Sequence, residues 1–290
     1  MNEAALMSEI PDWFWKAVET ESKTGSVEVD DVDICYRSWS EPGSPGLLFV
    51  HGHNAHSRWW DFIAPKYRED YQVVALDLSG MGDSDHRDNY SSDLFAAEIV
   101  AVADANQMPE DTIVVAHSFG GVMSMRTFAS HPSRFKGLIL VDSGVKHADD
   151  EKPQDVERWS KPKVYPSPEV ARSRFRLQPP QQCENEYLVQ YIARHSVDAI
   201  AYGFVWKFDE ELDSRMQYTG DRFEDLKSLT GNCALIYGQD SKSFGPKSVA
   251  YMQELQPALE VYGIKDAQHH LFLDQPIAFM NQLSAILDRW

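Results

Sequence analysis

The distribution of apolar residues along the chain is the first guide to its fold. Short, mainly apolar runs lie at 47–50 (LLFV), 72–78 (QVVALDL), 112–116 (TIVVA), 138–141 (LILV), 234–237 (ALIY) and 258–262 (ALEVY). Most of these runs are apolar throughout rather than alternating with polar residues, which is typical of parallel strands buried on both faces. They therefore predict the strands of a mostly parallel sheet.

Helical patterns separate the predicted strands. The segments 92–106 and 122–129 follow the second and third runs, and the segment 276–290 begins with a proline, which suits the first position of a helix. An earlier pair, 26–29 and 32–39, is typical of an antiparallel hairpin at the edge of a sheet. Because strands and helices alternate, the sequence predicts an α/β fold with a doubly wound, mostly parallel sheet.

The region 145–230 interrupts this alternation. Two of its stretches, 186–195 and 198–207, have a helical pattern, and its aromatic residues include Trp159. A connection of this length is too long for a plain loop. We therefore predict a helical cap inserted after the strand that ends near Asp142. The predicted organisation is an N-terminal extension with a short helix at 1–25, an α/β core at 26–144 and 231–290, and a cap at 145–230.

The charge of the chain narrows the classes of partner. Its 290 residues have a formal net charge of −18. An acidic chain repels nucleic-acid phosphates and anionic lipid surfaces, so we expect a small-molecule substrate and neither nucleic acid nor a membrane as a partner. The sequence leaves open whether the protein is a monomer or a homodimer.

Targeting and cysteine patterns indicate a cytoplasmic protein. The N-terminus lacks the basic start and apolar run of a signal peptide, and no stretch approaches 18 consecutive apolar residues. The three cysteines are odd in number and far apart, which is typical of neither a disulfide framework nor a metal site. We therefore expect a reducing environment.

The sharpest chemical signal is the segment TIVVAHSFGG at 112–121. A buried strand runs into Ala116, His117, Ser118, Phe119 and Gly120, which form a small-x-Ser-x-Gly nucleophile elbow at a strand-to-helix turn. The small residues allow the tight turn, and the N-terminus of the following helix suits a developing oxyanion. The motif predicts that Ser118 is a nucleophile.

Four motifs together resemble those of the α/β-hydrolase superfamily, over residues 27–290. They are VHGH at 50–53, DLSGMGDS at 77–84, the elbow, and QHHLFLDQP at 268–276. Among capped members, the chain is similar to small esterases and to hydrolases that cleave carbon–carbon bonds in ring-fission products. The resemblance implies the α/β-hydrolase fold and a catalytic triad in the chain order of serine, acid and histidine.

The resemblance also points to the partners of Ser118. In the family's histidine loop the catalytic residue often stands seven residues before a proline, which favours His269 over the adjacent His270 as general base. Two acids directly follow predicted strands, Asp142 and Asp240. The commoner family pattern places the acid where this chain has Ser241, whereas some small esterases take it from the earlier strand end. Asp142 is preferred and Asp240 is the alternative.

The remaining site residues are implied by the same resemblance. The backbone N–H groups of His53 and Phe119 are expected to form the oxyanion hole, and Gly52 leaves room for the substrate oxygen. Gly52, His117 and Trp159 are the predicted substrate-binding residues, with His117 packed beside the elbow rather than acting in catalysis.

A metal site is the alternative interpretation of the histidines near the first motif. His51, His53 and His56 are close in sequence, and three histidines with an open position can hold zinc. The elbow and its histidine partner explain the neighbourhood without a metal. We therefore expect no metal and no other cofactor.

The predicted function is that of a serine hydrolase. It cleaves a carboxylic ester, or a related lactone, thioester or amide, of a small apolar or aromatic substrate through an acyl-enzyme. The alternatives are a carbon–carbon bond hydrolase of diketone-like substrates, a lyase or cofactor-independent oxygenase on the same scaffold, and a non-enzymatic ligand receptor, because fold does not determine chemistry.

Overall fold

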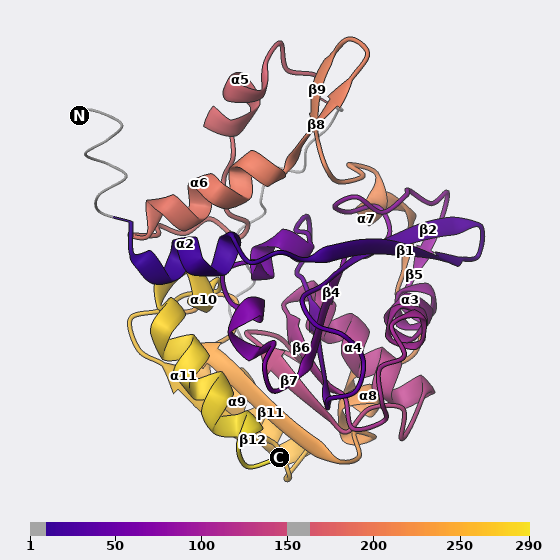
Figure 1. Cartoon of the computed structure of the whole chain (residues 1–290). Coiled ribbons are helices and arrows are strands. Elements are labelled where there is room, and N and C mark those ends of the chain that lie inside the picture. The colour runs from indigo at the N-terminus through magenta and orange to yellow at the C-terminus, as the bar shows by residue number, and fades with distance from the viewer. Residues whose placement is uncertain (1–9, 150–162) are drawn as a thin grey trace.

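A computed structural model describes residues 10–149 and 163–290. In this part of the chain an eight-stranded sheet forms the centre of the molecule (Figure 1). Its strands, in spatial order, are β1 (Lys23–Val29), β2 (Val32–Ser38), β4 (Gln72–Leu76), β3 (Gly46–Val50), β6 (Ile113–His117), β7 (Gly137–Val141), β11 (Asn232–Gly238) and β12 (Glu260–Ile264).

The strand pairing confirms the predicted fold class. All pairs from β4 to β12 are parallel, whereas the β1–β2 and β2–β4 pairs are antiparallel. The predicted edge hairpin is therefore formed by β1 and β2. Every residue of β3, β4, β6 and β7 is buried, which accounts for the apolar runs in the sequence.

Helices cover both faces of the sheet. Successive residues of β3 alternate between two apolar clusters, with Leu47 and Phe49 in one and Leu48 and Val50 in the other, because side chains of a strand point alternately to opposite faces. The first cluster includes residues of α2 (Asp12–Val18) and α11 (Pro276–Leu287). The second includes residues of α3 (Ser92–Ala105), α4 (Phe119–Ser130), α8 (Arg222–Lys227) and α9 (Pro246–Leu255).

Several predicted helices are confirmed, with ends that differ from the prediction by no more than three residues. They are α2, α3, α11 and α6 (Glu186–His195), while α4 begins three residues earlier than predicted, directly after Ser118. The described chain also has three short helical turns, η1 (Ser57–Trp60), η2 (Ala64–Tyr67) and α10 (Leu271–Asp274). No helix of the described residues is long and apolar enough to cross a membrane.

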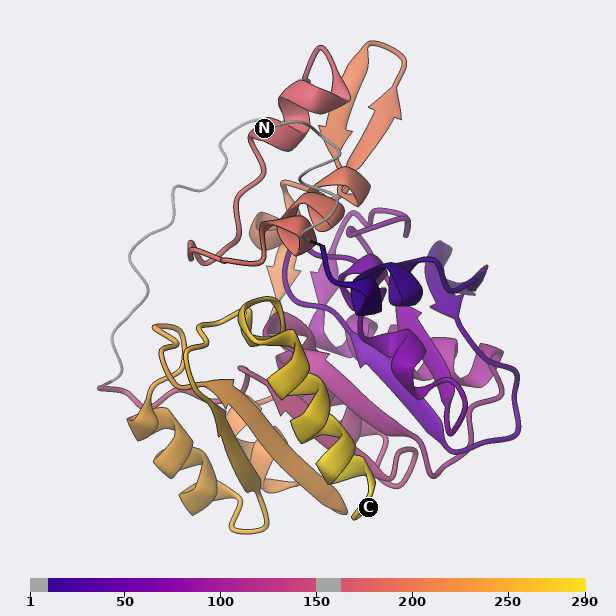
Figure 2. The same cartoon turned by 60° about the vertical axis from the view of Figure 1, so that its left-hand side comes forward.

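The segment after β7 stands beyond the carboxyl end of the sheet. Its described elements are α5 (Pro168–Ser173), α6, β8 (Val197–Ile200), β9 (Gly203–Trp206), α7 (Leu212–Arg215) and β10 (Met216–Gln217). In both views α5, β8 and β9 project away from the core, and α6 lies between them and α2 (Figure 1, Figure 2). Strand β10 returns to the core and pairs with β5 (Tyr90–Ser91), and α8 packs against α4.

The helix predicted over 198–207 is wrong, because this stretch forms the antiparallel hairpin β8–β9. Gly203 at the turn has a φ of +152°, a conformation that L side chains rarely adopt. The hairpin also packs through Trp206 on Tyr165 and Ala171. These tertiary contacts outweigh a local helical pattern.

The loops that matter for chemistry all leave the same edge of the sheet. Ser118 follows β6, Asp142 follows β7, and the segment 51–53 follows β3. The histidine loop at 268–270 follows β12. Because these strands are parallel, their carboxyl ends lie side by side, and open α/β sheets place their ligand sites at this edge.

Candidate active site

Ser118 occupies a strained turn between β6 and α4. Its φ of +51° and ψ of −118° are uncommon for a residue other than glycine. The turn needs small neighbours, because a Cβ atom on Gly120 would overlap the carbonyl oxygen of His51, and one on Gly121 would overlap the Ser143 hydroxyl. Ala116, which replaces the first glycine of the usual motif, is fully buried at the end of β6. This backbone presents the Ser118 hydroxyl at the edge of the sheet.

A hydrogen-bonded chain joins three residues that are distant in sequence. The Ser118 Oγ and His269 Nε2 atoms lie 2.9 Å apart, and His269 Nδ1 lies 2.7 Å from Asp142 Oδ2. A carboxylate only accepts hydrogen bonds, so His269 Nδ1–H donates to Asp142, and Nε2 is free to accept the Ser118 proton. His269 and Asp142 are buried, whereas Ser118 is partly accessible.

Asp142 is held in place by two further donors. The Gly238 N–H donates to Oδ1 at 3.0 Å, and the Ser241 hydroxyl donates to Oδ2 at 2.7 Å. Asp240, the alternative acid, is exposed, and its backbone N–H donates to Ala267 O at 2.9 Å. His269 thus donates its hydrogen bond to Asp142, the first of the two candidate acids. Ser241 supports that acid, a contact that sequence reasoning did not predict.

The segment 51–53 runs directly against the nucleophile. A Cβ atom on Gly52 would lie 2.7 Å from His117 Nδ1 and 3.3 Å from Ser118 Cβ. The His53 ring contacts the Phe119 ring, with centroids 5.5 Å apart. Phe119 is the first residue of α4, whose first N–H groups have no acceptor within the helix. The two residues predicted to form an oxyanion hole therefore flank Ser118.

The histidines of this segment face different partners. His51 Nδ1 donates to Gly52 O at 2.7 Å, and His51 Nε2 accepts from Leu78 N–H at 3.0 Å, so this ring braces the loop. His53 Nε2 lies 3.1 Å from a carboxylate oxygen of Asp213 in α7. His56 Nε2 lies 2.9 Å from Ser196 Oγ in the segment after β7. Burial lowers the pKa of His56 well below the ordinary value. These rings do not converge on one point.

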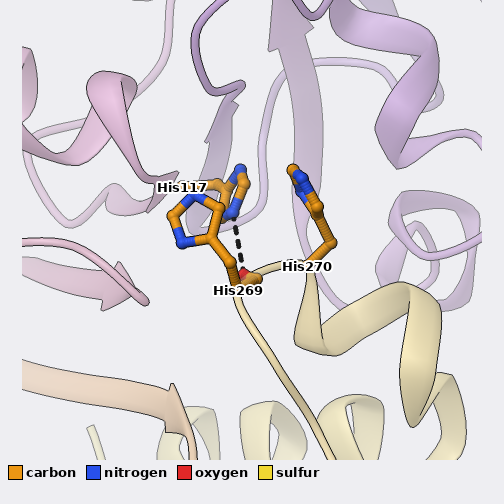
Figure 3. Close-up of side chains that lie close together, drawn as sticks. All are labelled: His117, His269 and His270. Atoms are coloured by element: carbon orange, nitrogen blue, oxygen red, sulfur yellow. Dashed lines mark hydrogen bonds between the residues drawn. The ribbon is translucent and has the colours of Figure 1, made fainter. Parts of the chain in front are cut away.

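A second histidine cluster lies beside Ser118. One ring nitrogen from each of His117, His269 and His270 lies within 4.8 Å of the other two (Figure 3). His117 Nε2 donates to the carbonyl oxygen of His269 at 3.2 Å, which holds the histidine loop to the elbow. Burial lowers the pKa of His117 and of His270 well below the ordinary value, so both rings are neutral. A metal here would have to displace Asp142 or Ser118 from His269.

A cleft opens between the core and the segment after β7. On the core side it is lined by His53, Asn54 and Trp59. On the other side it is lined by Arg174, Phe175, Arg176, Gln178, Ser196, Trp206 and Phe208. Ser118, His269 and Asp142 are not in this lining, whereas His53, whose ring contacts Phe119, is part of it. His117 is buried beneath the segment 51–53, and Trp159 lies outside the described residues.

Hydrogen bonds hold the segment after β7 to the core. The His56 Nε2–H donates to Ser196 Oγ at 2.9 Å, while the Ser196 hydroxyl donates to Ile192 O at 2.8 Å. Tyr191 donates to a carboxylate oxygen of Asp61 at 2.6 Å. These side chains are far apart in sequence, and no local pattern identified them.

The histidine loop is held by the same segment. The Gln181 amide donates to both carboxylate oxygens of Asp274 at 3.0 Å and accepts from His270 N–H at 2.9 Å. Asp274 in turn accepts from Gln268 N–H at 2.8 Å. The loop that carries His269 is therefore held to the segment after β7 by hydrogen bonds.

Comparison with known proteins decides the family. A model described as "Alpha/beta hydrolase family" matches residues 47–283, which is most of the chain and includes Ser118 and His269. The chain belongs to the alpha/beta hydrolase family. The predicted resemblance is thereby confirmed, and the elbow, the histidine loop and the mostly parallel sheet are features of an alpha/beta hydrolase.

Relatives within the family have different named activities. Lipase LipV of Mycobacterium tuberculosis is 31% identical over 114 residues, which cover 39% of this chain and 43% of the lipase. Epoxide hydrolase 4 of Homo sapiens is 28% identical over 110 residues, which cover 37% of this chain and 30% of that protein. The matched segments span less than half of either curated relative, so these matches establish neither an activity nor a substrate.

A solved structure matches over a much longer stretch. The thioesterase domain from the curacin biosynthetic pathway superposes with a TM-score of 0.75 and 25% identity. The alignment covers 92% of this chain and 99% of that domain. The alpha/beta hydrolase architecture thus extends over nearly the whole described chain.

Proposed function

We propose that this alpha/beta hydrolase is a serine hydrolase that cleaves a carboxylic ester, or a related acyl bond, of a small substrate through an acyl-enzyme. The observation that carries the proposal is the chain of hydrogen bonds from Ser118 through His269 to Asp142, with distances of 2.9 and 2.7 Å. A serine hydroxyl is a poor nucleophile at neutral pH, and an adjacent imidazole removes its proton as attack proceeds.

The reaction follows from the positions of these groups. Ser118 Oγ attacks the acyl carbon while His269 Nε2 takes its proton, and Asp142 stabilises the resulting imidazolium. The N–H groups of Phe119 and His53 receive the oxyanion. His269 then protonates the leaving alcohol, which departs and leaves an ester on Ser118. Water, deprotonated by His269, attacks this ester, and the proton returns to Ser118 as the acid leaves.

A serine at the elbow favours acyl transfer over epoxide opening. An acyl-serine ester has a carbonyl carbon that water attacks under the same general base. Opening an epoxide with Ser118 would instead form a stable ether with no carbonyl group for water to attack. Acyl chemistry is also what the names of the lipase and the thioesterase domain state.

Other reactions on this scaffold make different demands. Hydrolysis of a carbon–carbon bond in a diketone would use the same triad but would require protonation of a carbanion by His269. A lyase or a cofactor-independent oxygenase would use His269 without an acyl-serine intermediate. Labelling of Ser118 and turnover of esters therefore distinguish the proposed function from the last two alternatives.

The first experiment is labelling with a fluorophosphonate probe, read by peptide mass spectrometry. We expect an adduct on Ser118 in the wild type and in the control Ser130→Ala, which changes an exposed serine at the end of α4. The adduct should be absent in Ser118→Ala and strongly reduced in His269→Ala. A folded wild-type protein that hydrolyses no ester and stays unlabelled by both this probe and a smaller sulfonyl fluoride would contradict the proposed function.

A further inference from the structure

Two arginine side chains line the cleft beside the nucleophile. Arg174 directly follows α5, and Arg176 lies two residues later. The chain as a whole is acidic, with 27 Lys and Arg residues against 45 Asp and Glu residues. Among the described residues that line the cleft, no side chain is a carboxylate. The described lining therefore carries two cationic side chains and no anionic one.

These arginines differ from most others in the structure. Within residues 10–149 and 163–290, neither Arg174 nor Arg176 forms an ion pair with a carboxylate, and Arg176 Nη1 donates only to the carbonyl oxygens of Ser173 and Phe175. In contrast, each of the following arginines lies against an Asp or Glu: Arg37, Arg58, Arg68, Arg87, Arg126, Arg134, Arg215 and Arg289. A guanidinium group has five N–H donors, so both cleft arginines keep donors for a ligand.

The core side of the cleft includes residues that neighbour the predicted acyl site. His53 lines the cleft, and its ring contacts Phe119, the residue after Ser118. Trp59 also lines it, and its ring centroid lies 5.4 Å from that of His270, next to the base. Two residues on the core side of the cleft therefore contact the sequence neighbours of Ser118 and His269, while Arg174 and Arg176 belong to the other side.

The walls of the cleft include several aromatic side chains. Phe175, Trp206 and Phe208 line the cleft on the side of the segment after β7. Arg174 and Arg176 are exposed, whereas Trp206 is buried and Phe175 and Phe208 are half-buried. The arrangement suits a molecule with a short apolar chain and a charged end.

We propose that the cleft binds an acyl substrate that carries a carboxylate, with this carboxylate against Arg174 and Arg176 and the acyl carbon at Ser118. The planar fork of a guanidinium group matches the two oxygens of a carboxylate. The substrates of this class are half-esters of dicarboxylic acids and their thioester or amide analogues. The placement of the acyl carbon rests on the proposed function, whereas the anion subsite rests on the cleft alone.

The test compares two esters that differ at one end. Mono-4-nitrophenyl glutarate has a carboxylate where 4-nitrophenyl valerate has a methyl group, and the two acyl chains have equal length. We expect the wild type to favour the anionic ester at least tenfold in kcat/KM. Arg174→Gln and Arg176→Gln should each reduce this ratio about fivefold, mainly through KM, because each removes one charge-assisted contact. Arg194→Gln, which changes an exposed arginine of α6 outside the cleft lining, should leave the ratio unchanged.

Charge reversal provides a test whose expected result is a gain of activity, which an unfolded variant could not give. In the double variant Arg174→Glu/Arg176→Glu, the 4-nitrophenyl ester of 4-(trimethylammonio)butyrate should gain kcat/KM relative to the valerate ester. A wild-type ratio near one, or a ratio that does not change when both arginines are replaced by Gln, would overturn the proposal.

A binding measurement separates the subsite from the chemistry. Monoethyl glutarate is titrated calorimetrically into Ser118→Ala, with and without Arg174→Gln/Arg176→Gln. Binding that is lost with the arginines supports the subsite even if the wild type hydrolyses no ester, in which case only the proposed function fails. Absence of binding to Ser118→Ala, or tighter binding of inorganic phosphate than of the half-ester, would overturn the assignment of a carboxylate subsite.

Discussion

Replacement of Asp142 by Asn isolates the role of the buried acid. The carboxylate accepts three hydrogen bonds, from His269 Nδ1 at 2.7 Å, from the Ser241 hydroxyl at 2.7 Å and from Gly238 N–H at 3.0 Å. Asn keeps the shape and can retain the Gly238 bond through its carbonyl oxygen. Its NH₂ group, however, would face His269 Nδ1 and would hold that atom as an acceptor.

The change of tautomer sets the size of the expected effect. If Nδ1 accepts from Asn, the proton moves to Nε2, which then cannot take the Ser118 proton at 2.9 Å. The charge that stabilises the imidazolium is lost as well. We expect kcat to fall by about 10⁴, which corresponds to about 5 kcal/mol of transition-state stabilisation.

The assay is steady-state hydrolysis of a 4-nitrophenyl ester by Asp142→Asn and by the matched control Asp240→Asn. Asp240 is exposed, so its variant should keep kcat within about twofold of the wild type. Circular dichroism and urea denaturation establish that both variants are folded. A folded Asp142→Asn enzyme with a tenth or more of the wild-type rate, or an equal loss in Asp240→Asn, would refute the assignment of the acid.

Three further predictions follow from single contacts. Ser241→Ala removes a donor to Asp142 and should lower kcat about fivefold with KM unchanged, and an unchanged kcat in steady-state assays would argue against a positioning role. Gly120→Ala places a Cβ atom on the carbonyl oxygen of His51 and should lower the free energy of unfolding by about 2 kcal/mol in urea denaturation, whereas wild-type stability would contradict the tight turn. Burial and nearby cationic side chains lower the pKa of His195 to about 4 from 6.5, so NMR should give a ring titration midpoint near 4. Because the unfolded chain binds this proton more readily, the free energy of unfolding should be highest above pH 6.5 and should decrease as the pH falls from 6.5 toward 4. A ring titration midpoint near 6.5 would contradict this prediction.

Much of the fold was readable from local patterns. The runs at 47–50, 112–116 and 138–141 are almost entirely apolar because these strands are covered on both faces, and each overlaps a buried strand of the parallel sheet. The elbow was readable for a similar reason, since a tight strand-to-helix turn demands small residues at fixed positions around the serine. The segment 198–207 was misread because its hairpin is stabilised by packing on residues elsewhere in the chain.

The choice of partners across the site required the folded chain. Asp142 and Asp240 both follow strands, and their local sequences do not say which carboxylate faces the histidine loop. The backbone at the end of β7 aims Asp142 at His269, and Ser241 completes its hydrogen bonds.

The position of the cleft arginines was likewise not predictable from the sequence. Arg174 and Arg176 lie in a stretch with no motif, and the packing of the segment after β7 over the core brings them into one lining with His53. Periodic burial and backbone strain act over a few neighbouring residues, so they restrict which residue types occur at neighbouring positions of the sequence. Contacts between side chains more than a hundred residues apart depend on how the helices and the sheet pack together. Only the tertiary structure therefore determined which of these side chains meet at the site.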